Sequence, residues 1–129
     1  MTPAEIAGFL ARCPQMVVGA IDGAGWPTGT LAASTSPVST SAASTSESVL
    51  SLRFDPRDPI LDELARDPHL CCIADEHESY AEIRGVIVHG RVASADQRRA
   101  DGSQGDVVAV DVVVAVDRTI SFDFGRLTA

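Results

Sequence analysis

The sequence predicts a mainly β protein, an antiparallel barrel of six to seven strands with two short helices. Short apolar segments rich in β-branched residues recur along the chain, and turns rich in Gly, Pro and Asp separate many of them. Only two segments place apolar residues at helical spacing. So many antiparallel strands within 129 residues favour a barrel, because closing a sheet removes its exposed edges.

Both helices have recognisable start and stop signals. Thr2 and Glu5 have the spacing of a capping box, and Pro3 occupies the first helical position. Asp58 is the predicted N-cap of the second helix, which ends at the Asp-Pro pair 67–68. The apolar faces comprise Ile6, Phe9, Leu10 and Cys13 in the first helix and Ile60, Leu61 and Leu64 in the second.

Seven segments are predicted to be strands, namely 16–21, 26–32, 49–54, 70–74, 80–93, 107–116 and 120–124. The first two form a hairpin around an Asp-Gly turn. Residues 70–74 are apolar throughout, which predicts burial on both faces. Residues 107–116 are also apolar on both faces, so we expect one face in the core and the other against a partner subunit. The polar residues 94–106 are expected outside the sheet.

The whole chain, 1–129, is predicted to form a single split-barrel domain with one unusual segment. In residues 33–48, ten of sixteen are Ser or Thr. This composition predicts a surface loop or insertion. The alternative is that some of these hydroxyls line a phosphate or sugar pocket.

Charge and composition limit the classes of molecule that the protein is expected to bind. Eighteen acidic residues against ten basic ones give a net charge of −8, which argues against general affinity for nucleic acid or an anionic membrane. Every basic residue is Arg, so an anion site must use guanidinium, backbone N–H or hydroxyl groups. The absence of Lys and Asn is typical of a GC-rich genome. No apolar run reaches the length of a membrane span, so we expect a cytoplasmic protein.

The sequence predicts neither a metal site nor a catalytic side chain. Its three cysteines do not have zinc or disulfide spacing, and His69, His77 and His89 lack regular ligand spacing. Cys71 and Cys72 are adjacent on one predicted strand, so their side chains point to opposite faces and cannot easily form a redox pair.

Three segments in this order resemble the pyridoxamine 5′-phosphate oxidase-like family of FMN-binding split barrels. They are MVVGAIDGAGWPTG (16–29), LSLRFDPRDPILDELARDPHLCCI (50–73) and IRGVIVHGRV (83–92). The resemblance implies a six-stranded split barrel that forms a homodimer with cofactor sites at the subunit interface. It also implies an oxidoreductase that acts on a small molecule with FMN or, as in some actinobacterial relatives, a deazaflavin coenzyme.

The resemblance also implies which residues hold the cofactor. Arg53 and Arg57 bracket the predicted phosphate loop, and the N–H groups that open the second helix would assist them. Thr30 and Ser34 are expected at the phosphate and ribityl groups, and Trp26 at the ring.

One residue departs from the family pattern. Ile60 stands where the family usually places a Lys on the cofactor phosphate. This departure leaves two alternatives open: a non-catalytic split-barrel module that binds flavin, haem or another ligand, and a dimer that has lost its cofactor site.

Overall fold

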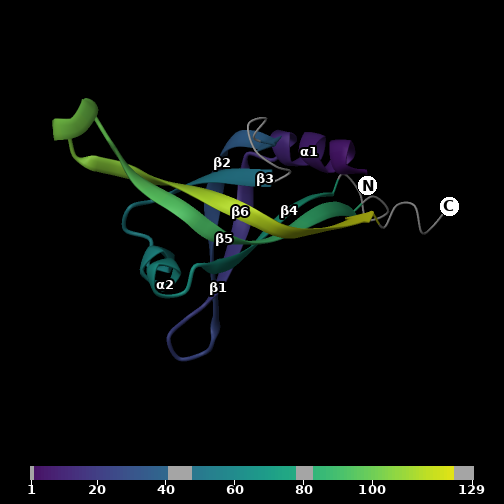
Figure 1. The fold of residues 1–129 in the computed structure, drawn as a ribbon, viewed down its shortest axis with the longest axis horizontal. Helices are drawn as coiled ribbons and strands as arrows, with labels where there is room; N and C mark the ends of the chain where they lie inside the picture. Colours follow the sequence, from purple (N-terminus) through teal and green to yellow (C-terminus); the bar gives the residue numbers. More distant parts are fainter. Residues whose placement is uncertain (1, 41–47, 78–82, 124–129) are drawn as a thin grey trace.

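A computed structural model of the chain describes residues 2–40, 48–77 and 83–123. Six antiparallel strands form a closed barrel, as predicted, and their order around it is β1-β2-β3-β6-β5-β4 (Figure 1). The elements are α1 (Pro3–Arg12), β1 (Gln15–Ile21), β2 (Pro27–Thr40), β3 (Ser48–Phe54), α2 (Ile60–Arg66), β4 (His69–His77), β5 (Ile83–Arg99), a 3-10 turn (Gly102–Gln104) and β6 (Val107–Asp123).

The two helices begin and end close to the predicted residues. Thr2 caps α1, since its hydroxyl oxygen accepts the backbone N–H of Glu5 at 3.2 Å. Helix α2 begins one residue later than predicted, at Ile60, and ends before Asp67. Helix α1 packs mainly on β2, whereas α2 contacts β1 and β2, and Arg66 of α2 donates to the carbonyl of Ile21 at the far end of β1.

The core fills the barrel between the helices. Strand residues alternate between the interior and the outer face: along β1, Met16, Val18 and Ala20 are buried while Val17 is 45% exposed. The fully buried side chains of greatest volume are Phe9, Phe54, Leu10, Met16, Leu50, Leu52, Val18, Val86, Val88, Val112, Val114 and Cys72. No polar side chain in the described residues is buried.

The Ser/Thr-rich segment is not a loop in its described part. Residues 33–40 continue β2 and pair with β3, while 41–47 lie outside the described residues. Hydroxyl side chains are compatible with a strand, and the pairing register shifts between Ser34 and Ser36 and again before Ser39. Pro37 lies between Ser36 and Ser39, where the β2–β3 register shifts. Proline has no backbone N–H, and at this shift no regular β2–β3 hydrogen bond depends on one.

Three other strand predictions are corrected. Strand β5 continues through the polar residues 94–99, because they pair with β6 in a long hairpin (Figure 1). The two predicted C-terminal strands form one strand, β6, in which a register shift accommodates Asp117 between the partners of His89 and Gly90. Strand β4 is not buried on both faces, since Ile73 is 37% exposed on its outer side.

The barrel closes along a short seam. Strands β1 and β4 are joined by three residue pairs, Val17 with Ile73, Val18 with Cys72 and Gly19 with Cys71. The other neighbouring strands pair over longer stretches. The outer surface of this seam includes Gly19 and carries the hollow described below.

Candidate functional site

The predicted phosphate loop lies between β3 and α2, where Asp58 is held by two hydrogen bonds. The hydroxyl of Thr30 donates to Asp58 Oδ2 at 2.5 Å, and the backbone N–H of Ile60 donates to Asp58 Oδ1 at 3.0 Å. Thr30 faces the interior because its pairing partner Val18 is completely buried. The Thr30 hydroxyl therefore connects β2 to this loop.

The start of α2 does not offer the anion site that the sequence predicted. The Asp58 carboxylate already accepts the Ile60 N–H, and the Leu61 N–H donates to the Asp58 carbonyl at 3.2 Å. A carboxylate placed here repels a phosphate. The side chain of Ile60, at the position expected for a Lys, is 3% exposed and belongs to the core.

Arg53 lies on the other side of the barrel wall from Thr30. Its neighbours Leu52 and Phe54 point into the core, so its own side chain points outward. Arg53 Nε donates to Asp111 Oδ1 at 2.8 Å, and Arg98 Nε donates to Asp111 Oδ2 at 3.2 Å. Within the described part of the chain, the Nη groups of both arginines have no hydrogen-bond partner.

Asp111 and Arg98 were not among the predicted site residues. Asp111 is the only charged residue in the valine-rich segment 107–116, and this isolation was the available signal. Arg98 lay in a segment predicted to be outside the sheet, so its position two strands from Arg53 could not be anticipated.

The hydrogen bond from Arg53 is the main reason that the pKa of the Asp111 carboxyl is lowered, and Arg98 adds to the effect. A carboxyl with a depressed pKa in the folded state stabilises the protein above its unfolded pKa, and this contribution disappears as pH falls through the folded value. We therefore expect Asp111→Asn to be slightly less stable than the parent at pH 7. The difference should shrink in urea titrations repeated at successively lower pH below the ordinary Asp value of ~3.9.

Asp106→Asn is the matched control for this titration. Asp106 is exposed and forms no ion pair within the described residues. Equal pH profiles for the Asp111 and Asp106 variants would contradict a stabilising role for the Arg53–Asp111 pair.

The remaining predicted residues are dispersed. The Arg57 side chain is exposed in the loop before α2 and has no hydrogen bond or ion pair among the described residues, while its backbone N–H donates to Asp55 Oδ1 at 2.8 Å. Trp26, in the β1–β2 turn, is 70% exposed. Ser34 is half-buried and pairs with the buried Leu52. Thr30 and the Arg57 loop are thus brought together, whereas Arg53 lies on the outer face.

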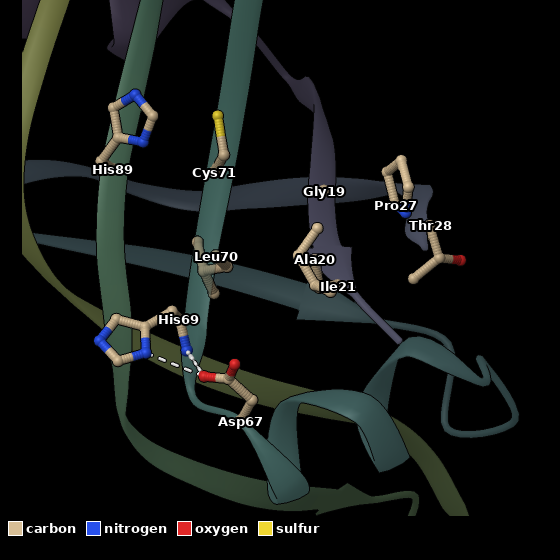
Figure 2. A pocket seen from close by; sticks show the side chains of 10 residues that line it. All are labelled: Gly19, Ala20, Ile21, Pro27, Thr28, Asp67, His69, Leu70, Cys71 and His89. Carbon is tan, nitrogen blue, oxygen red and sulfur yellow. Dashed lines mark hydrogen bonds and ion pairs between the residues drawn. The ribbon is translucent and has the colours of Figure 1, made fainter. Parts of the chain in front are cut away.

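A hollow of about 360 Å³ opens on the outer face over the barrel seam (Figure 2). The residues that line it are Gly19, Ala20, Ile21, Pro27, Thr28, Asp67, His69, Leu70, Cys71 and His89. Figure 2 shows both imidazoles on the β4–β5 side of the hollow and Pro27 and Thr28 on the opposite side. No local sequence pattern indicates this hollow, because its residues come from β1, the start of β2, the end of α2, β4 and β5.

One histidine of the hollow is fixed by a carboxylate. Asp67 Oδ1 lies 2.8 Å from His69 Nδ1 and accepts the His69 backbone N–H at 3.1 Å. These contacts lower the pKa of the Asp67 carboxyl, with the side-chain hydrogen bond as the largest cause. Because Nδ1 is engaged by the carboxylate, Nε2 of His69 remains available to a ligand.

The thiols of Cys71 and Cys72 are not activated. Burial raises the pKa of Cys71, and it raises the pKa of Cys72 to about 12, with a smaller contribution from Cys71. Reactive cysteines need the thiolate form, which these surroundings disfavour. Within residues 2–40, 48–77 and 83–123, no three His, Cys, Asp or Glu side chains are placed to hold a metal ion. The helices described there are all too short and polar to cross a membrane.

A closed six-stranded antiparallel barrel with two short helices is the architecture of the pyridoxamine 5′-phosphate oxidase-like split-barrel proteins, and solved structures of that class match this chain over most of its length. An F420 reductase matches with a TM-score of 0.65 and 12% identity, covering 92% of this chain and 98% of that one. A putative pyridoxamine 5′-phosphate oxidase of Listeria innocua has a TM-score of 0.62 and 13% identity, covering 92% and 96%. An FAD-binding protein of Mesorhizobium loti also has a TM-score of 0.62 and 13% identity, covering 94% and 93%.

These likenesses establish the fold that the sequence predicted. The scan against family models gives no match, and neither does the search of curated proteins.

Proposed function

We propose that this chain is a homodimeric, cytoplasmic oxidoreductase that uses FMN or a deazaflavin coenzyme to act on a small molecule. The observation that carries the proposal is the match to an F420 reductase and an FAD-binding protein across more than nine-tenths of the chain. Such a cofactor supplies hydride transfer, and the protein supplies position and charge.

In this proposal the cofactor phosphate is held by Arg53 or Arg57, which the structure places on the outer face of β3 and in the loop before α2. Arg57 is unpaired within the described residues, and Arg53 keeps its Nη groups available while Asp111 holds its Nε. Two guanidinium groups that present N–H pairs suit a phosphate. In this proposal Thr30 steadies the Arg57 loop through Asp58, Ser34 lies toward the ribityl chain and Trp26 covers the ring.

An apolar row on the outer face supports a dimer. Register places Leu31, Val17, Ile73, Ile87 and Ile120 side by side across β2, β1, β4, β5 and β6. Leu31 is 60% exposed, and the other four are also incompletely buried. A continuous exposed aliphatic row of this kind is typical of a subunit interface. We propose that a second copy of the chain covers it.

The dimer can be tested with one charge in this row. Leu31→Glu should convert the protein from dimer to monomer in size-exclusion chromatography with light scattering at about 10 μM, because the charge would be buried without a partner. Ala95→Glu is the control, since Ala95 is exposed on β5 and lies outside both the row and residues 107–116. A monomeric parent protein, or a dimer that tolerates Leu31→Glu, would remove the interface from the proposal.

Cofactor binding is the decisive measurement for this function. We expect the fluorescence of FMN or of deazaflavin to be quenched when the protein is titrated with it, with a micromolar dissociation constant. Arg57→Ala should weaken the binding of FMN about tenfold, because a charge-assisted hydrogen bond is lost. Riboflavin, which lacks the phosphate, should bind the parent protein and the Arg57→Ala variant with equal affinity. Arg99→Ala, on the β5–β6 hairpin, should leave the affinity for FMN unchanged. No binding of either cofactor at ~100 μM, about −5 kcal/mol, would exclude the proposal.

A non-catalytic binding module is the second candidate. Ile60 fills the core where the family pattern has a Lys, and the Asp58 carboxylate occupies the start of α2. Both features weaken a phosphate grip, so a module that holds flavin, haem or another ligand without turnover fits them. The two functions are distinguished by whether bound cofactor is reduced by a nicotinamide donor and reoxidised by an acceptor.

A further inference from the structure

The hollow over the seam lies on a row of five outward-facing residues whose side chains change from none to basic along the row. Register places Gly29, Gly19, Cys71, His89 and Arg118 side by side across five strands. The residues that precede or follow them along β1, β4 and β5 are buried, so this row faces outward. The row runs from two residues without side chains, through a thiol, to an imidazole and a guanidinium.

The glycine end gives the hollow a flat floor. A Cβ built on Gly19 would lie 3.7 Å from the Thr28 carbonyl oxygen, an ordinary contact, so packing does not require a glycine here. The bare backbone of Gly19, which lines the hollow, instead leaves space above the sheet, whereas a Cβ on the neighbouring Gly29 would lie 3.3 Å from the Val18 carbonyl oxygen. Ile21 and Pro27 flank this floor, so its surroundings are apolar. A flat apolar floor suits a planar ring.

The other end of the row is basic. His89 and Arg118 have no hydrogen bond or ion pair among the described residues, and His69 is held by Asp67 with Nε2 available. The carboxylates around the hollow are already engaged in pairs, namely Asp67 with His69, Asp117 with Arg91 and Glu63 with Arg66. Arg118 therefore contributes a positive charge that no described carboxylate neutralises.

We propose that this hollow binds a small planar organic anion, an aromatic or heteroaromatic ring that carries a carboxylate, sulfonate or phosphate group. The ring lies on the floor at Gly19, and the anionic group points toward His89, which lines the hollow, and toward Arg118, which pairs with His89 from β6 just outside it. The volume of about 360 Å³ is in the range of small-molecule pockets.

The site is separate from the arginines assigned to the flavin phosphate. Thr28 lines the hollow, whereas Ala33 pairs with Arg53, and these two residues are about 17 Å apart along an extended strand. The proposal does not depend on flavin binding, and its test uses the protein without any cofactor.

A matched pair of fluorescent probes tests the site. The anionic probe is 8-anilino-1-naphthalenesulfonate, and the neutral one is N-phenyl-1-naphthylamine, which has the same ring system without the sulfonate. We expect saturable binding of the anionic probe to the full chain. A double variant in which His89 and Arg118 are both replaced by Gln should bind the anionic probe about tenfold more weakly, because charge-assisted hydrogen bonds are lost. The affinity of the neutral probe should stay unchanged.

Filling the floor gives an independent check. Gly19→Leu should abolish binding of both probes, while Arg98→Gln, a charge removal elsewhere on the barrel, should change neither. If Gly19→Leu does not fold in circular dichroism, the His89 and Arg118 double variant decides alone, since both side chains are exposed. The proposal is overturned if the double variant affects both probes equally. It is also overturned if Leu31→Glu, rather than the hollow variants, abolishes binding, because the probe then reports the apolar row.

Discussion

Phe54→Ala should lower the free energy of unfolding by about 3–5 kcal/mol, the largest effect expected for a single substitution in this chain. Phe54 is the last residue of β3, is 1% exposed and pairs with Val110 of β6. Removing its ring leaves a cavity that two hydrogen-bonded neighbouring strands cannot collapse to fill. Because small domains are stable by only about 5–15 kcal/mol, much of the total would be lost.

Urea denaturation followed by circular dichroism measures this loss as a lower midpoint at an unchanged slope. Phe54→Leu is the control, because it keeps most of the buried apolar volume and should cost clearly less. A loss below about 1 kcal/mol for Phe54→Ala would mean that the ring is not packed as the structure shows.

Gly90→Ala should destabilise the barrel by about 1–3 kcal/mol through a steric conflict. The added Cβ would lie inside van der Waals contact with the carbonyl oxygen of Ala115 and 2.8 Å from Val114 Cγ1. Gly90 does not have a positive φ, so the conflict is one of space rather than backbone conformation. The partner atom is main chain in β6, beside the register shift at Asp117, and it cannot rotate away as a side chain would.

Gly19→Ala is the matched control for Gly90→Ala, since it makes the same change in another strand. Its Cβ would approach no atom closer than 3.7 Å, so its stability should stay within about 0.5 kcal/mol of the parent. Thermal unfolding of the two variants compares them directly. Equal midpoints would show that β6 adjusts to a side chain at position 90.

Local signals predicted the helices well. The capping of α1 by Thr2 and the end of α2 before Asp67 depend on contacts within a few residues, which the sequence displays directly. Strand ends were predicted less well, because pairing with a distant partner decides them. Residues 33–40 and 94–99 have polar compositions typical of loops, yet each lies in a strand because β3 or β6 offers a complementary edge.

The candidate site was harder to predict because side-chain direction depends on the phase of each strand. Thr30 and Arg53 were assigned to one ligand, but the structure places the Thr30 side chain toward the interior and that of Arg53 toward the outside. Asp58 was predicted as the cap of α2, and its carboxylate does accept the Ile60 N–H. The additional bond from Thr30 joins positions that are distant in sequence, and no local pattern reveals it.

The short β1–β4 seam has a consequence for the order of folding and for local opening. Its strands are far apart in sequence, so its three residue pairs close a long loop, and we expect them to form after the local hairpins. A ladder this short also has the fewest bonds to break, which makes it the natural point at which the native barrel opens and its amides exchange with water. The floor of the hollow includes Gly19 and Cys71, one of these three pairs. A molecule seated there contacts both sides of the joint, so occupancy of the hollow and closure of the barrel are thermodynamically linked.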